Sequence, residues 1–186
     1  YGNAYQIARL LQAEDSDTSN RLGHFSDVMN LNHLFAFLQE TQNLKALMKK
    51  DFSSQLPELI VKPVVGDFLK NFQNTDNNPA LFQYKLACWQ YKHMNYAAAL
   101  ISLQEGILSY ACQIAHHDCN DKDERQLVKD RICNDQDFLP YELRGVYFAV
   151  TKNRNVVAHA LESELSSGKI IDNLRKSLET VGKYIL

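Results

Sequence analysis

A chain of 186 residues with 45% hydrophobic and 23% charged residues carries enough apolar material for a packed core, which excludes global disorder. Seven glycines and four prolines are few for an all-β protein, because such folds need a turn every few residues. A formal net charge of −2 excludes a polycation that coats nucleic acid, and no apolar run reaches the length of a membrane span.

The first part of the chain predicts helices. Apolar residues at helical spacing indicate a helix within residues 1–14, and the polar run at 14–20 is a solvated loop or a helix entry. Residues 22–50 carry a longer helical pattern, which we interpret as two helices that meet near Thr41–Asn43.

The strongest break in the chain is the run Asn-Thr-Asp-Asn-Asn-Pro at 74–79, and Pro57 and Pro63 punctuate the segment before it. We place a domain boundary at this run. Residues 1–78 then form an N-terminal helical annex, and residues 79–186 form a second helical domain.

The second domain begins with an aromatic-rich helix at 79–93, whose Phe82, Tyr84, Trp89 and Tyr91 are expected in the core because aromatic residues at helical spacing usually are. Asn95 has the character of a cap for the following helix, which reaches residue 114, so the two form an antiparallel hairpin. A charged stretch with a short helix near 124–132 follows.

Pro140 opens a helix at 141–150, and Thr151–Asn153 is expected to interrupt it. Further helices are predicted at about 155–165 and 170–185. No segment alternates as a strand does, so the predicted fold class is all-α, a multi-helix bundle.

A short stretch near the C-terminus brings together the side chains needed to cleave a phosphodiester without metal. Arg154 can clamp a phosphate through a fork of N–H donors, and His159 can move a proton near neutral pH. Asn155 lies four residues before His159, on one helical face with it, and can orient the imidazole. Lys152 and Asn153, which flank Arg154 in the expected turn, are candidates for contact with an RNA backbone.

Helical geometry constrains this pair. Five residues turn an ideal helix by about 500°, which leaves Arg154 and His159 about 140° apart. Either Arg154 sits in a helix break at Lys152–Asn153, or a second copy of the chain completes the site. From spacing alone, an arginine at a helix start and a half-buried core histidine are the simpler interpretation.

The sequence Arg154-Asn155-x-x-x-His159 in an all-α chain resembles the motif of the HEPN ribonucleases, and the stretch 95–105 resembles an earlier helix of that fold. The resemblance is greatest to the C-terminal part of the CRISPR-associated ancillary ribonucleases of type III systems, in which a CARF sensor domain precedes the nuclease. No Gly-rich βαβ unit occurs here, and the chain begins Tyr1-Gly2 without a methionine. We therefore expect a fragment whose annex links to a missing sensor domain.

The resemblance implies a HEPN-type bundle that acts in antiviral defence as a metal-independent endoribonuclease on single-stranded RNA. The products would carry 2′,3′-cyclic phosphate and 5′-hydroxyl ends. It further implies a homodimer, no cofactor, no metal, no membrane, and cyclic oligoadenylate only through the absent sensor. In this scheme His159 is the general base or acid, Arg154 holds the scissile phosphate, and Asn155 positions His159 or the RNA. The alternative is a non-catalytic all-α interaction or dimerisation module.

A structural zinc site is a second candidate, because Cys112, His116 and Cys119 fall on one face of a continuous helix and Cys133 can add a ligand. The more usual interpretation is a pair of core thiols beside two helix-end histidines. The four cysteines form no C-x-x-C pair, so we expect reduced thiols in a cytoplasmic protein. Glu105 can face a cleft and orient a partner there, but a glutamate in such a helix more often lies on the solvated side, which is the expectation here.

Overall fold

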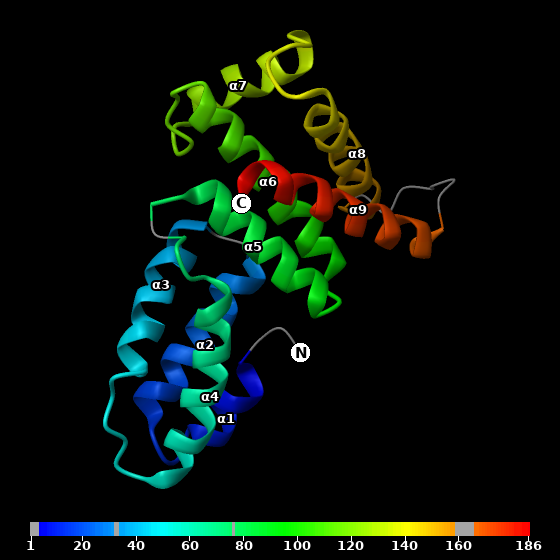
Figure 1. Ribbon diagram of the computed structural model, residues 1–186. Coiled ribbons are helices and arrows are strands. Elements are labelled where there is room, and N and C mark those ends of the chain that lie inside the picture. The colour runs from blue at the N-terminus through cyan, green and yellow to red at the C-terminus, as the bar shows by residue number, and fades with distance from the viewer. Residues whose placement is uncertain (1–3, 32–33, 76, 159–165) are drawn as a thin grey trace. The chain divides into compact units, whose positions relative to one another are not determined.

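The computed structural model describes residues 4–31, 34–75, 77–158 and 166–186, and within them it contains nine helices and no strand (Figure 1). The predicted all-α class is confirmed. The contacts divide the chain into two compact units, Tyr1–Gln73 and Asn74–Leu186, so the units separate at the first residue of the polar run that begins at Asn74.

Within the described ranges, every helix is too short or too polar to cross a lipid bilayer.

Unit 1, as far as its residues are described, is a bundle of four helices that pack in chain order. The helices are α1 (Tyr5–Leu11), α2 (Ser16–Leu31), α3 (Leu34–Leu47) and α4 (Gln55–Asn71). Its interior contains a cluster of aromatic rings, in which Phe25 meets Phe68 edge to face at 4.8 Å and Phe68 stacks on Phe72 at 4.6 Å between ring centroids. Such ring pairs add to the stability that burial of their area alone provides.

Asp15 ties the start of α2 to the residues that follow α3. Its Oδ1 accepts the backbone N–H of Thr18 at 3.1 Å, which is an N-terminal capping bond, and Lys50 Nζ donates to its Oδ2 at 2.7 Å. Burial alone would raise the pKa of this carboxyl, but the bonds from Lys50 and Thr18 outweigh it and hold the pKa below the usual value of 3.8. The polar run at 14–20 is thus a helix entry.

Two expectations for unit 1 are wrong. Residues Thr41–Asn43 do not separate two helices; they lie inside α3, where the Thr41 hydroxyl donates to the Phe37 carbonyl one turn back at 2.9 Å. The prolines do not interrupt their segment either. Pro57 occupies the first turn of α4, where the backbone N–H has no helical partner anyway, and Pro63 is accommodated within the helix.

The described residues of unit 2 form five helices, arranged around the second of them. They are α5 (Pro79–Lys92), α6 (Tyr96–Ile114), α7 (Lys122–Asn134), α8 (Tyr141–Ala158) and α9 (Ser167–Ile185). α6 contacts all four others, and a single hydrophobic cluster contains residues from each of the five. α5 and α6 form the predicted hairpin, and Phe82 and Tyr84 are buried as expected, whereas Trp89 and Tyr91 are only half-buried.

Two glycines let helices of unit 2 approach closely. A Cβ at Gly106 of α6 would lie 3.3 Å from the Gln83 Cβ and from the Tyr84 backbone nitrogen of α5. Tyr84 in turn reaches α9, where its hydroxyl donates to the Leu178 carbonyl at 3.2 Å and occupies the space that a Cβ at Gly182 would need. The missing side chains are therefore part of how α5 fits between α6 and α9.

α8 is a single continuous helix, so the predicted interruption at Thr151–Asn153 is wrong. Thr151 stays helical because its hydroxyl donates to the Tyr147 carbonyl at 2.8 Å, which satisfies the polar group within the helix. The helix begins after Pro140, as predicted. α9 starts at Ser167, three residues earlier than expected, after the N-terminal cap Ser166.

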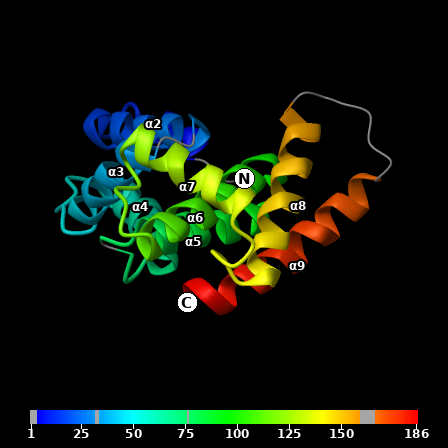
Figure 2. The same ribbon diagram turned by 90° about the horizontal axis from the view of Figure 1, so that it is seen from above.

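Arg144 joins α8 to the end of α7. Its Nε donates to the Ile132 carbonyl and its Nη2 to the Cys133 carbonyl, both at 2.8 Å. Carbonyls in the last turn of a helix lack intrahelical partners, so the guanidinium satisfies them and complements the negative end of the helix dipole. Figure 2 shows that α8 and α9 lie close together at the C-terminal end of α9 and diverge towards the C-terminal end of α8.

Candidate functional site

Arg154 lies in the last turn and a half of α8 as part of the regular helix. Its side chain is half-buried, and its Nη1 donates to the Asn155 Oδ1 at 3.1 Å. Its Nε is buried without a hydrogen-bond partner among the described residues. One terminal nitrogen of the guanidinium is thus anchored, and because the Nε is buried, a phosphate oxygen can accept hydrogen bonds only from the terminal Nη groups.

Asn155 therefore contacts the arginine. Its amide oxygen is the acceptor for Arg154, and its side chain is half-buried. The predicted contact between Asn155 and His159 lies outside the described residues, as do His159 itself and the rest of 159–165. The described part of the site is the Arg154–Asn155 pair.

Lys152 and Asn153 differ in exposure. Lys152 is exposed, whereas Asn153 is only 7% exposed and lies on the inward row of α8 with Tyr147 and Val150. The prediction that both contact RNA rests on a turn beside Arg154, and that premise is wrong because the helix continues. Lys152 keeps the access to solvent that a contact with an RNA backbone requires; Asn153 does not.

The arginines of α8 are spread along the helix. Arg144 and Arg154 are ten residues apart, roughly 15 Å along an α-helix. Arg144 is bound to the end of α7, so it cannot serve the same phosphate as Arg154. Lys152 and Arg154 are the described cations near the end of α8.

The structure does not bring the candidate zinc ligands onto one helical face. α6 ends at Ile114 and His116 has a positive φ of 56°, so Cys112, His116 and Cys119 do not share a helical face. Cys112 is fully buried and Cys133 is exposed. No group of three metal-binding side chains occurs in the ranges that the structure covers. Burial raises the pKa of the Cys112 and Cys119 thiols, which makes them poorer metal ligands.

Glu105 is half-buried and forms an ion pair with Arg125 of α7, so the expectation of a solvated glutamate is wrong. The same guanidinium donates from Nη1 to the Cys119 carbonyl at 3.0 Å. Glu105 thus connects α6, α7 and the turn between them, which is a structural task.

Sequence reasoning missed a groove between α8 and α9, which lies on the outer side of α8. It has a volume of about 520 Å³ and is lined by the first half of α8 and by Thr180 and Lys183 of α9. Tyr141 is 91% exposed there and Phe148 is 38% exposed. The signal was present, because Tyr141, Gly145 and Phe148 are spaced by four and three residues, but the same spacing also describes a buried helix face.

Comparison with known proteins gives two matches. Residues 1–78 match the family model described as "CRISPR-associated protein MJ1674, second domain". The chain is also 27% identical over 167 residues to the CRISPR-associated protein MJ1674 of Methanocaldococcus jannaschii. This alignment covers 86% of the chain and 26% of the relative, so the chain spans about a quarter of the relative's length. No solved structure matches.

Proposed function

We propose that this chain belongs to a CRISPR-linked defence protein and carries a HEPN-type, metal-independent endoribonuclease site for single-stranded RNA. The similarity to MJ1674, which runs through most of the chain, supports the CRISPR link. The observation that carries the nuclease assignment is the Arg154–Asn155 pair on α8, whose members lie five and four residues before His159 in the sequence.

The chemistry is transesterification followed by release. A His159 imidazole removes the proton from the ribose 2′-hydroxyl, and the 2′-oxygen attacks the adjacent phosphorus. The bond to the 5′-oxygen breaks, and an imidazolium returns a proton to that oxygen, which gives 2′,3′-cyclic phosphate and 5′-hydroxyl ends. Arg154 stabilises the charge that grows on the phosphoryl oxygens. DNA resists because it lacks the attacking hydroxyl.

The continuity of α8 bears on how the site is completed. The sequence left two arrangements open, and the first of them, in which Arg154 sits in a helix break, is excluded because α8 runs continuously through Arg154. The proposal takes the other arrangement, in which two copies of the chain come together and the Arg154 and His159 residues of a homodimer share one cleft.

The test is cleavage of a labelled single-stranded RNA in EDTA by the wild type and by Arg154→Ala and His159→Ala. We expect cleavage to survive chelation and to fall by about 100-fold or more in each variant. The RNA products should carry 2′,3′-cyclic phosphate ends, and a DNA of the same sequence should remain uncut. Cleavage that needs a divalent metal, or that persists in both variants, refutes the assignment.

The second candidate is a non-catalytic interaction module. It is favoured by the partial burial of Arg154 and by its bond to a neighbour on its own helix, since both are also features of a packing arginine. A dimer that shows no cleavage, also within a longer protein supplied with cyclic oligoadenylate, supports this candidate.

A further inference from the structure

We propose that the groove between α8 and α9 binds unpaired bases of the RNA strand, with Tyr141 and Phe148 as stacking platforms. This inference rests on the proposed RNA substrate and adds a binding subsite away from the cleavage residues. It places the strand along the outer side of α8, from the start of the helix to the Arg154–Asn155 pair.

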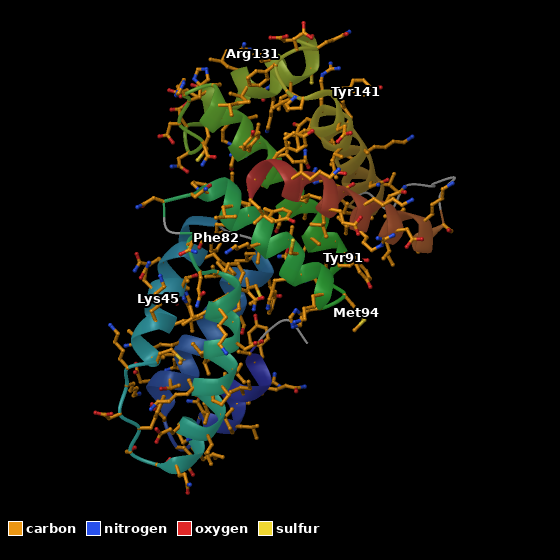
Figure 3. All side chains as sticks on the ribbon, viewed as in Figure 1. Lys45, Phe82, Tyr91, Met94, Arg131 and Tyr141 are labelled. Carbon is orange, nitrogen blue, oxygen red and sulfur yellow. The ribbon has the colours of Figure 1, made fainter. Side chains whose placement is uncertain are left out.

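The first support is the exposure of two aromatic rings on one helix face. Tyr141 is 91% exposed at the start of α8, on the outside of unit 2, where Figure 3 labels it. Phe148 follows seven residues later, and Gly145 and Ala149 lie in the groove beside the rings. A Cβ at Gly145 would meet nothing within 4 Å, so the groove is open there and a flat base can approach.

The second support is the Arg144 guanidinium, which is held over the Phe148 ring. The Arg144 guanidinium carbon lies 5.0 Å from the centroid of the Phe148 ring, and its nitrogens are held by the Ile132 and Cys133 carbonyls. Bases stack on aromatic rings and on guanidinium planes alike. Because the hydrogen bonds already immobilise Arg144, little side-chain entropy remains to be lost when a base stacks there.

The third support is continuity with the site. Seven residues turn an α-helix by about 700°, so Tyr141, Phe148 and Asn155 lie within about 40° of one another around α8. Phe148 is roughly 10 Å from Asn155 along the axis, and Tyr141 roughly 21 Å. Lys152 is exposed between Phe148 and Asn155, where a phosphate of the same strand would pass.

Charge favours RNA over a second copy of the chain as the occupant. The groove holds Arg144 and Lys183 against Glu142, whose Oε2 is 4.0 Å from Lys183 Nζ, and Lys152 extends the positive side. Protein interfaces are depleted in lysine and glutamate at their cores, whereas grooves for single strands combine exposed aromatic rings with cations.

The test is fluorescence anisotropy of a labelled RNA of about ten nucleotides, in EDTA, with all proteins carrying His159→Ala so that the RNA stays intact. We expect Tyr141→Ala and Phe148→Ala each to weaken binding by about fivefold or more. Tyr141→Phe and Phe148→Tyr, which keep a ring, retain binding. Leu127→Ala is the matched control, since Leu127 is 60% exposed on α7 outside the groove.

Two lysine variants complete the test. Lys183→Ala should reduce the slope of log affinity against log salt concentration by the amount expected for about one phosphate contact. Lys122→Ala, at the start of α7, should leave that slope unchanged. Unaltered affinity in both ring variants, while cleavage still depends on Arg154 and His159, overturns the groove and leaves the proposed nuclease standing. Weakened binding with no cleavage, also within a longer protein supplied with cyclic oligoadenylate, supports the groove and removes the nuclease.

Light scattering on the same variants tests whether a second copy of the chain, and not RNA, occupies the groove. If Tyr141→Ala or Phe148→Ala dissociates a dimer, the groove is an interface between copies and the inference is overturned. If the oligomeric state is unchanged while RNA affinity falls, the inference is supported.

Discussion

The Nη1 of Arg154 donates to the Oδ1 of Asn155 at 3.1 Å, so in the described structure this asparagine orients the arginine. The sequence suggested that Asn155 would serve the imidazole, because residues four apart share a helix face. Neighbours in sequence do not share a face, but a long arginine side chain can reach back across the helix surface. The pair is the most specific structural feature of the candidate site.

Asn155→Ala should release the Arg154 guanidinium and lower kcat for RNA cleavage by about 10- to 100-fold, the range for a lost hydrogen bond to a charged group. KM should change little, because the proposed strand contacts at Lys152 and in the groove are left unaltered. Asn155→Asp keeps an acceptor and should recover much of the rate. Steady-state kinetics with matched thermal denaturation checks this, and an unchanged kcat would show that the bond has no catalytic role.

Gly182→Ala should destabilise unit 2 by about 1–3 kcal/mol, although alanine is normally favoured over glycine in a helix. The new methyl group would overlap the Tyr84 hydroxyl oxygen and lie 3.2 Å from the ring carbon that carries it. Denaturation followed by the fluorescence of Trp89, the single tryptophan and part of α5, measures the loss.

Two variants distinguish overlap from helix propensity at Gly182. Tyr84→Phe removes the overlapping oxygen and should recover part of the stability in the Gly182→Ala background. Gly145→Ala, where the methyl group meets nothing, should stabilise α8 by about 0.5–1 kcal/mol. A neutral or stabilising Gly182→Ala would contradict the packing of α5 against α9.

Glu105→Ala should cost about 1–2 kcal/mol, because it leaves the Arg125 guanidinium half-buried with the Cys119 carbonyl as its remaining described partner. The double variant Glu105→Ala, Arg125→Met should lose less stability than the sum of the losses in the two single variants, because the two side chains interact. Denaturation of the four proteins gives the coupling. Glu179→Ala, which breaks an exposed pair with Arg175, is the control and should change stability by less than about 0.5 kcal/mol. Strict additivity would argue against the Glu105–Arg125 pair.

Asp15→Asn should destabilise unit 1 by about 1–3 kcal/mol near pH 7, through loss of the charge that Lys50 and Thr18 bind. The folded state holds the pKa of Asp15 below its ordinary value, so its contribution is fully present above the unfolded pKa of 3.8 and is lost as the pH falls through the folded pKa. The wild type and the variant should therefore converge in acid.

Urea denaturation followed by circular dichroism over a series of pH values measures this difference, and Asp17→Asn, at an exposed carboxylate, serves as the control. A gap between wild type and Asp15→Asn that stays constant down to about pH 2 would contradict the linkage.

The sequence by itself determined the fold class and most helix positions, because helical periodicity and scarce turn residues are local properties. The α5–α6 hairpin, the start of α8 after Pro140 and the helix near 124–132 all followed from that pattern. The local signal failed where polar or proline residues lie within helices, as at Pro63 in α4 and Thr151 in α8. There the cost of a missing or competing hydrogen bond is smaller than the gain from continuous packing.

The candidate residues Arg154, Asn155 and His159 were also found from sequence, since a motif is a property of residue order. Only the tertiary structure decided that Arg154 is bonded to Asn155, that Asn153 faces inward while Lys152 faces solvent, and that Glu105 pairs with Arg125. Only the structure distinguished the exposed rings of Tyr141 and Phe148 from core aromatics. Helical spacing states which residues share a face, but what covers that face depends on contacts made by helices distant in the sequence.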